Sequence, residues 1–444
     1  MKRDYSISII HLLLTTFFSM FAIIFYYSNH NIICCLILFL IGFKEFTYYK
    51  KNFGYYTNML SIFSIIWFCS IGLSTLRLHW IQSVWKFETW VGLVLAYIFF
   101  VLGFKFRLSK KEKVIDNEIK CNKEISKQSF FCFYSFMALL PIITLILEIF
   151  LNGGNIPLLS DDMASYQNFA VGKLHYITVS CCFTLPISYL LIHFYKISKG
   201  ELLYIVILDL ISIIIPIIIV SRQLIIISIV MFSYLLIYYN KKNEKKILIY
   251  SLILIAFGWV FIGSFRNQDD NYLTMALRIK NTNISVSTMQ AYMYISMNFD
   301  NFDYNVGRLK EYQYGINSIF PIFGLTGIKN FFPEQWFLLY DRLGRIINVY
   351  NTYPIVMTPY MDGGVPFICL YMFIIGIICR KYEINDKRKL INLLISIILK
   401  CCLTFSFFAA WFSRPTWWFY MILLIVVNRV FFNNSVLPKK REEI

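Results

Sequence analysis

Long apolar segments alternate with short polar ones along almost the whole chain of 444 residues. A helix needs about 20 apolar residues to cross a hydrocarbon core of roughly 30 Å. Segments near that length are residues 7–27, 31–48, 55–76, 86–104, 129–151, 173–195, 202–220, 223–240, 247–264, 355–379, 391–411 and 415–432. The pattern predicts an all-α polytopic membrane protein with about 12 transmembrane helices, in which residues 1–444 form a single integral membrane domain.

Two connecting segments are too long to be simple turns. Residues 152–172 (NGGNIPLLSDDMASYQNFAVG) begin with Gly and Asn turn residues and continue into a short polar stretch. Residues 265–354 form a second, much longer connection between the ninth and tenth predicted spans. In it we expect a helix over 272–297, a Gly-, Pro- and Phe-rich centre over 319–333 and an amphipathic stretch over 334–350. Loops of this size usually carry function.

Charge decides which side of the membrane these loops face. Only 15% of the residues are charged, against 58% hydrophobic, and the net charge is +17. Lys and Arg fall mainly in alternate connections, which the positive-inside rule assigns to the cytosol together with both termini. The two long loops then face the outer side, and the basic charge is a topology signal. We therefore expect the lipid bilayer, and no nucleic acid, as a partner.

The motif search excludes several classes of enzyme. The sequence has no nucleotide-binding loop, HExxH, zinc-type cysteine pair or nucleophile elbow. The cysteines lie in predicted spans or in a cytosolic loop, which indicates no disulfide framework, and the five histidines are scattered. Paired carboxylates at 161–162 and 269–270 are typical of solvated positions or helix starts as well as of hard-cation sites. We predict no metal and no cofactor.

Charged residues at the outer boundary are the remaining candidates for chemistry. Arg222 stands between two apolar spans, either as an interfacial anchor or as a cation aimed at a lipid-linked phosphate. Arg266 follows the ninth span and begins the long loop. Further loop arginines are Arg278, Arg308, Arg342 and Arg345. Basic and acidic residues balance between residues 266 and 362, so a surface ion pair is the alternative role for any one of these arginines.

The order of several motifs resembles a known family. NGGNIPLL follows the fifth span, an SR pair separates two spans, and an arginine leaves the ninth span. The long loop contains MNFDNFD and ends in NTYPIVMTPYMDGGVPF. Together these features are similar to the Wzy-type oligosaccharide repeat-unit polymerases, which include O-antigen and capsule polymerases. The resemblance covers the whole chain in topology, and its specific part is residues 351–364. The spaced arginine and glycine pattern described for some of these enzymes is not clear here, which leaves open which loop arginines are catalytic.

The resemblance implies a metal-independent membrane glycosyltransferase of GT-C-like architecture in the bacterial cytoplasmic (inner) membrane. Such an enzyme moves a growing glycan from undecaprenyl diphosphate to a repeat unit on a second undecaprenyl diphosphate at the outer face. The implied partners are undecaprenyl-diphosphate-linked oligosaccharides, a chain-length regulator and a flippase. Two alternatives are an O-antigen ligase or other envelope glycosyltransferase, and a lipid-linked oligosaccharide flippase. A flippase predicts short loops throughout, which the long loop does not match.

The chemistry of such a transfer suggests roles for individual residues. The departing diphosphate gains negative charge, which cations at the membrane surface would stabilise. A carboxylate would orient or deprotonate the acceptor hydroxyl. Our hypotheses are Arg222 and Arg266 as catalytic cations, Asp362 and Asp303 as carboxylates, Arg308 and Arg345 as diphosphate ligands, and Asn351 and Tyr353 as sugar contacts. Gly363 and Gly364 are expected to allow a tight turn into the tenth span.

Overall fold

The computed structural model describes most of the chain. The described residues are 9–106, 124–160, 168–264, 280, 286–309, 311–332, 343–347, 350–385, 389–432 and 435–438. Within them, helices and the turns between them make up the structure, apart from an isolated parallel bridge between Glu124 and Val436. The chain divides into two compact units, each described here by itself.

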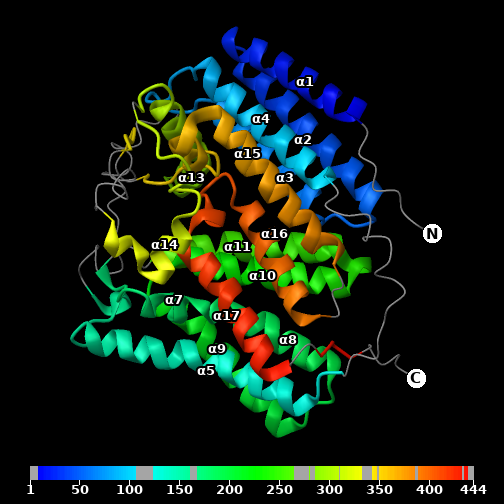
Figure 1. The fold of residues 1–444 in the computed structure, drawn as a ribbon, viewed down its shortest axis with the longest axis vertical. Helices are drawn as coiled ribbons and strands as arrows, with labels where there is room; N and C mark the ends of the chain where they lie inside the picture. Colours follow the sequence, from blue (N-terminus) through cyan, green and yellow to red (C-terminus); the bar gives the residue numbers. More distant parts are fainter. Residues whose placement is uncertain are drawn as a thin grey trace. The chain divides into compact units, whose positions relative to one another are not determined.

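Unit 1 consists of Met1–Lys110, Asp269–Asn385 and Cys402–Trp418. Its long helices are α1 (Ile9–Tyr27), α2 (Asn31–Phe53), α3 (Met59–Thr75), α4 (Phe87–Lys105), α13 (Val286–Asn305) and α15 (Met357–Ile384). Its short elements are α14 (Phe320–Thr326), η5 (Ile328–Phe331) and η8 (Trp411–Ser413). In Figure 1, the blue and cyan helices α1 to α4 run alongside the orange helix α15, with α13 at one end of this bundle.

Unit 2 consists of Lys111–Gln268, Asp386–Cys401 and Phe419–Ile444. It contains α5 (Lys127–Leu151), η2 (Pro157–Leu159), α7 (Leu174–Thr178), η3 (Val179–Phe183), α8 (Thr184–Phe194), α9 (Lys199–Ile218), α10 (Arg222–Tyr239), η4 (Lys241–Asn243) and α11 (Glu244–Ser264). The unit boundaries fall within α16 (Leu390–Thr404) and α17 (Pro415–Phe432). The elements α7, η3 and α8 follow one another without a break, and together they occupy the sixth predicted span.

The helices confirm the predicted class of protein. Among the described residues, nine helices are long and apolar enough to cross a membrane, and α3 and α16 are shorter apolar helices. Every predicted span contains a helix or a run of consecutive helices. The span expected over 391–411 is shorter, because α16 ends at Thr404 and the chain turns over the following residues. A multi-pass helical membrane protein is therefore the fold; the number of crossings stays a prediction.

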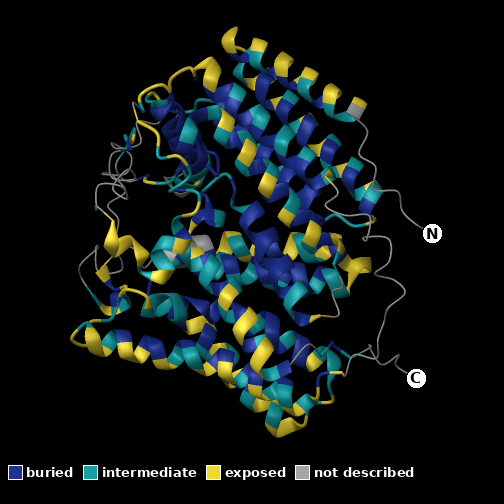
Figure 2. Cartoon of the chain, in the orientation of Figure 1, coloured by how far each residue is buried: buried dark blue, intermediate teal, exposed yellow. Residues whose placement is uncertain are grey.

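Side-chain exposure also fits a lipid environment. Apolar side chains on α1 and α5 remain highly exposed, for example Ile10 at 70% and Phe150 at 78%. In Figure 2 these helices carry bands of exposed residues along one face, whereas their opposite face is buried. Apolar faces of this extent are unfavourable in water and favourable in hydrocarbon. The exposed bands are consistent with contact to lipid.

Two glycines allow α4 and α15 to pack backbone to backbone. A Cβ atom added to Gly103 would lie 2.0 Å from the carbonyl oxygen of Phe373, and one added to Gly376 would lie 2.3 Å from that of Phe100. Small residues at helix crossings let backbones approach closely in membranes, where dispersion contacts replace the hydrophobic effect as the driving force. The crossing holds the start of α15 beside the start of α4.

The expected tight turn at the start of α15 is confirmed. Residues 357–362 form a first helical piece, and the backbone then leaves helical geometry at Gly363 and Gly364. Gly364 has φ 65° and ψ −153°, a region that is accessible in practice only to glycine. The break sets the direction in which Met357–Asp362 approaches the body of α15.

Candidate functional site

The helix α13 carries two acidic residues that bind one neighbouring segment. Asp300 accepts hydrogen bonds from Trp85 Nε1 and Gln82 Nε2, both at 2.7 Å. Asp303, three residues later on the same face, accepts from the Lys86 backbone nitrogen at 2.7 Å and from Thr89 Oγ1 at 2.6 Å. The connection between α3 and α4 and the first turn of α4 are thereby fixed to α13.

Three asparagines on α13 bind a different segment. Asn301 donates to the Tyr350 carbonyl at 2.8 Å and accepts from the Ile346 backbone nitrogen at 3.0 Å. Asn305 donates to the carbonyl of Gly344 at 2.8 Å and accepts from its nitrogen at 3.0 Å. Asn298 accepts a hydrogen bond from the hydroxyl of Thr352. Residues 343–347 and 350–352, which have little regular structure of their own, are held by these side chains.

We call α13 together with residues 76–89 and 343–353 the α13 platform. Its centre is buried, as the dark blue colour of α13 in Figure 2 shows. The helix expected over 272–297 in fact extends to Asn305. The predicted end was wrong because Asn and Asp favour turns in isolation, whereas here their side chains find partners in other segments. Residues 265–279, 281–285 and 333–342 lie outside the described residues, and so does most of the amphipathic stretch expected over 334–350.

One predicted arginine contacts a tyrosine of the platform, and a second follows a glycine that packs on the same tyrosine. The guanidinium carbon of Arg308 lies 3.7 Å from the ring centroid of Tyr304. Gly344 packs against the same ring so closely that an added Cβ would lie 2.2 Å from it, and Arg345 is the next residue. Both arginines are exposed. The platform therefore brings Arg308 and the backbone that carries Arg345 to the same tyrosine of α13.

The alternative of a surface ion pair finds no support for these two arginines. Among the described residues, no carboxylate lies within ion-pair distance of Arg308 or Arg345. Asp303 is close enough to Arg308 for the charge of the arginine to lower the pKa of the Asp303 carboxyl. Exposed cations without an acidic partner leave their hydrogen-bond donors available for an anion.

Asp303 keeps one carboxylate oxygen free of protein hydrogen bonds. Both donors to this residue, Lys86 and Thr89, reach Oδ1, and no donor among the described residues reaches Oδ2. Burial raises the pKa of Asp303 above its usual value, although the hydrogen bonds from Thr89 and Lys86 and the charges of Lys86 and Arg308 oppose this. A raised pKa makes a carboxylate a stronger base. The free oxygen and the raised pKa suit contact with a hydroxyl group.

Asp362 has a different hydrogen-bonding arrangement. Its Oδ1 accepts from the backbone and side-chain nitrogens of Asn317 at 3.0 and 2.9 Å, and its Oδ2 accepts from the backbone nitrogen and hydroxyl of Ser318 at 2.8 and 2.5 Å. The residue is fully buried. Both oxygens are thus occupied in holding residues 317–318 against the start of α15.

The remaining predicted residues of unit 1 divide by exposure. Asn351 is exposed at the surface of the platform. Tyr353 is buried, and its hydroxyl donates to the carbonyl of Gly344 at 3.4 Å, which supports the segment next to Arg345. Tyr360, which the sequence did not single out, accepts from the Gly307 nitrogen and donates to Glu88. Tyrosines are common where a span begins, because they anchor helices at the membrane interface. The sequence therefore gives no signal that Tyr360 makes specific hydrogen bonds.

The two other predicted arginines lie elsewhere. Arg266 falls outside the described residues. Arg222 belongs to unit 2, where it is buried and begins α10. The preceding residues form a tight connection, with Val220 at φ 50° and Ser221 capping the helix through the Leu224 nitrogen. A cation at a helix N-terminus adds to the positive end of the helix dipole, so this position favours an anion over a second cation.

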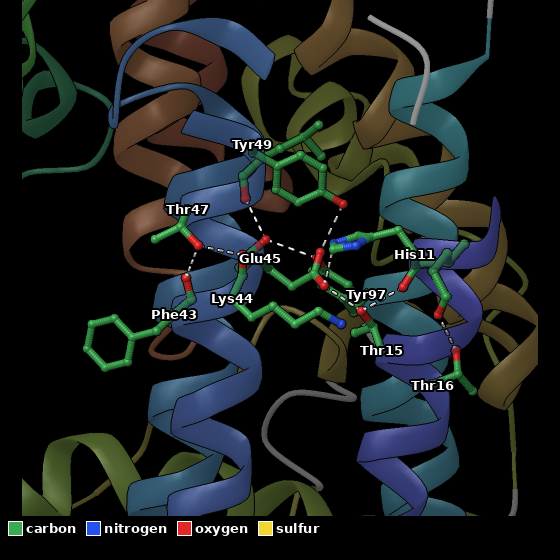
Figure 3. Close-up of polar contacts among 12 residues, drawn as sticks. His11, Thr15, Thr16, Phe43, Lys44, Glu45, Thr47, Tyr49 and Tyr97 are labelled. Atoms are coloured by element: carbon green, nitrogen blue, oxygen red, sulfur yellow. Dashed lines mark hydrogen bonds and ion pairs between the residues drawn. The ribbon is translucent and has the colours of Figure 1, made fainter. Parts of the chain in front are cut away.

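A second polar cluster lies among the predicted spans of unit 1, and Figure 3 shows it. Glu45 of α2 is fully buried and accepts hydrogen bonds from Thr15 of α1 and from Tyr97 of α4, the latter at 3.0 Å. His11 Nε2 lies 2.8 Å from Glu45 Oε1. An ionisable group at this depth is costly unless it is paired. The cluster links three helices through a single carboxylate.

Comparison with known proteins adds no family to these observations. The chain matches no family model, and it has no match among curated proteins or among solved structures. Within the described residues, no three His, Cys, Asp or Glu side chains are grouped so that they could hold a metal ion. The α13 platform and the order of motifs in the sequence are therefore the features that bear on function.

Proposed function

We propose that the protein is a membrane glycosyltransferase that polymerises oligosaccharide repeat units linked to undecaprenyl diphosphate, with the α13 platform as part of its active site at the outer membrane face. The observation that carries the proposal is the contact of Arg308 with Tyr304, one residue after Asp303, together with the packing of Gly344, the neighbour of Arg345, on the same ring. This arrangement combines exposed cations with a carboxylate oxygen that has no donor among the described residues. A glycosyl transfer from a diphosphate needs both groups.

In the proposed reaction, a hydroxyl oxygen of the acceptor sugar attacks the anomeric carbon of the donor glycan. The bond between that carbon and the diphosphate oxygen breaks, and its electron pair leaves with the undecaprenyl diphosphate. Arg308 and Arg345 stabilise the negative charge that develops on the leaving group. Asp303 accepts the hydroxyl proton through Oδ2.

In this proposal the other predicted residues have supporting parts. Asn351 contacts sugar at the platform surface, and Tyr353 holds the segment that carries Arg345. Asp362 keeps residues 317–318 in place at the entrance to α15. Arg222 and Arg266 remain further candidates for the donor or acceptor diphosphate, and Arg222 is favoured for such a role by its place at the start of α10.

The first test separates polymerisation from transport and ligation. A deletion strain that displays lipid-linked glycan of a single repeat length at its surface would support a polymerase. Complete loss of surface glycan would contradict the proposal and support the flippase or the ligase instead. A ligase would share the predicted topology and differ only in its acceptor, so this experiment is needed to distinguish it from a polymerase.

The second test addresses the two platform arginines. We expect Arg308→Gln and Arg345→Gln each to reduce the amount of long polymer about tenfold or more, since loss of one charge-assisted hydrogen bond to a phosphate corresponds to roughly 1.5–3 kcal/mol. Lys329→Gln, which removes an exposed cation from η5, is the matched control and should polymerise normally. Normal polymer from both arginine variants, at normal protein levels, would exclude the proposed role. Arg222→Lys tests the unit 2 candidate, because lysine keeps the charge but loses the planar fork.

A further inference from the structure

The connection between α3 and α4 is fixed by hydrogen bonds and contains a residue with a strained backbone. Arg77 adopts φ 51°, a left-handed conformation that costs a non-glycine residue roughly 1–2 kcal/mol. The next residue, Leu78, donates its backbone N–H to the hydroxyl of Tyr292 on α13, 3.2 Å away. That hydroxyl in turn donates to Gln82 at 3.0 Å, and Gln82 binds Asp300. The segment that follows Arg77 is therefore held by side chains of α13.

Several polar atoms of this connection are buried without a partner. Arg77 Nε and Nη1 have no hydrogen-bond partner among the described residues, and neither has Nδ1 of the buried His79. Leaving a buried donor unpaired costs about 1–3 kcal/mol, and more for a charged group. Such groups in a native fold require an explanation. A ligand that accepts hydrogen bonds would remove the cost.

A second cation lies against the first. Lys280 donates its Nζ to the Arg77 carbonyl at 2.8 Å, and its backbone nitrogen to the Leu78 carbonyl at 3.1 Å. Lys280 is exposed, and partial burial together with the charge of Arg77 lowers its pKa. Among the described residues, Asp300 is a carboxyl group whose pKa is raised by burial and, to a smaller extent, lowered by the charge of Arg77, and its two oxygens already accept from Trp85 and Gln82. Two cations held together without an acid between them form a site for an anion.

An aromatic ring completes the arrangement. Trp80 is 72% exposed, and Lys280 Nζ lies 5.5 Å from its ring centroid. The face of an indole ring carries partial negative charge and attracts the weakly positive C–H groups of an apolar sugar face. A free phosphate ion needs no such surface. The ring therefore distinguishes a saccharide ligand from a simple anion.

We propose that Arg77 and Lys280 bind the acidic substituent of an anionic saccharide, a carboxylate or a phosphate group, while its ring stacks on Trp80. The saccharide class rests on the proposed glycosyl transfer; the anion site follows from the buried donors themselves. The site holds the glycan away from the reacting bond, so Arg77 and Lys280 are specificity residues. It selects repeat units that carry an acidic sugar.

The experiment measures ligand binding to the purified full-length protein in lipid nanodiscs by saturation-transfer NMR. The probes are a hexuronic acid trisaccharide, a hexose phosphate, the matched neutral trisaccharide and inorganic phosphate. We expect one of the two acidic saccharides to bind at least about tenfold more tightly than the neutral one. Which of them binds identifies the substituent. Equal binding of acidic and neutral sugars, or of inorganic phosphate and acidic sugars, would overturn the proposal.

Variants separate ligand binding from folding. Arg77→Gly should keep or raise the unfolding temperature, because glycine adopts φ 51° without strain, yet it should lose acidic-sugar binding. Lys280→Gln and Trp80→Ala should weaken that binding, and Trp80→Ala should leave inorganic phosphate binding unchanged. Lys329→Gln is the matched control. If Arg77→Gly binds the acidic sugar like the unaltered protein, the proposal is wrong. The readout is binding, so a failure of the polymerase proposal would be recognised separately, in the polymer assay.

Discussion

Asp303 and Asp362 are both buried carboxylates of unit 1, and their hydrogen bonds distinguish them. Asp303 uses one oxygen for Lys86 and Thr89, whereas Asp362 uses both oxygens for Asn317 and Ser318. The sequence placed both residues in motifs of the long loop and its exit, and it offered them equally as catalytic groups. Which oxygen is occupied depends on segments distant in the chain, so no sequence pattern contains this information.

Substitution of Asp362 tests its part as a clamp. Asp362→Asn replaces an acceptor oxygen by a donor NH2 group facing the donors of Ser318 or Asn317. We expect a stability loss of roughly 1.5–3 kcal/mol, the range for hydrogen bonds to a charged group, measured as a lower unfolding temperature of the purified protein in detergent. Ser318→Ala should show a smaller loss in the same direction. An unchanged unfolding temperature with abolished polymerisation would instead make Asp362 a catalytic residue.

Asp300 makes stability depend on pH. Burial raises its pKa to about 7, against the hydrogen bonds from Trp85 and Gln82. The folded state then holds a proton that the unfolded state has released above its pKa of 3.8, so stability falls as pH rises from about 4 to about 7 and levels off above. Each unit of difference in pKa between the folded and the unfolded state corresponds to about 1.36 kcal/mol, so the free energy of unfolding changes by at most roughly 4 kcal/mol.

The measurement is the unfolding temperature between pH 4.5 and 8. Asp300→Asn removes the titrating group. The stability of this variant should therefore depend less steeply on pH than that of the unaltered protein, by a slope that corresponds to about one bound proton. Asp362→Asn serves as the control, because that variant keeps Asp300. A slope that is the same with and without Asp300 would show that the carboxyl is not protonated in the folded protein.

At the scale of elements, local pattern predicted the helices well in long and uniformly apolar segments. The spans over 7–27, 86–104 and 415–432 closely match α1, α4 and α17, because uniform apolarity dictates a helix in hydrocarbon regardless of neighbours. The prediction failed for α13, whose end lies eight residues beyond the expected Met297. Its Asn and Asp side chains find their long-range partners among residues near 82–89 and 344–352, which the sequence does not identify as neighbours.

The crossing of α4 and α15 depends on glycine at two positions. Gly103→Ala and Gly376→Ala each place a methyl group within 2.0–2.3 Å of a backbone oxygen, and backbone cannot move aside as a side chain can. We expect each variant to lose about 1–3 kcal/mol or more, seen as a fall in unfolding temperature and in the yield of folded protein.

Gly258→Ala in α11 is the matched control for this prediction. An added Cβ there meets only Ile225 Cγ2 at 3.4 Å, and alanine has the higher helix propensity. Its unfolding temperature should be unchanged or slightly higher. Gly103→Ala and Gly376→Ala variants as stable as Gly258→Ala would mean that α4 and α15 do not cross in direct backbone contact.

For the whole molecule, the sequence established the class of protein, and it located part of the candidate site. Apolar length and the distribution of Lys and Arg are sums over many residues, so errors at single positions do not change the outcome. The site depends on which loops meet. Arg308 and Arg345 were singled out as loop cations, but Arg77, Trp80 and Lys86 were passed over because the 76–86 connection is short. Only its hydrogen bonds to α13 indicate that this connection belongs with the long loop.

The predicted topology requires the long loop and residues 152–172 to face the same side of the membrane, opposite to the basic connections. Epitope tags test this at glycines with positive φ and no atom within 4 Å of an added Cβ, namely Gly154 and Gly327, and at η4 (Lys241–Asn243). In spheroplasts with intact membranes, an antibody should label the tags at Gly154 and Gly327, and should reach η4 only after permeabilisation. The positive-inside rule predicts this because η4 and its surroundings are rich in lysine. Labelling of all three tags without permeabilisation, from correctly folded protein, would rule out the predicted 12-span topology. Labelling of Gly327 alone would place residues 152–172 on the other side of the membrane and contradict the predicted topology.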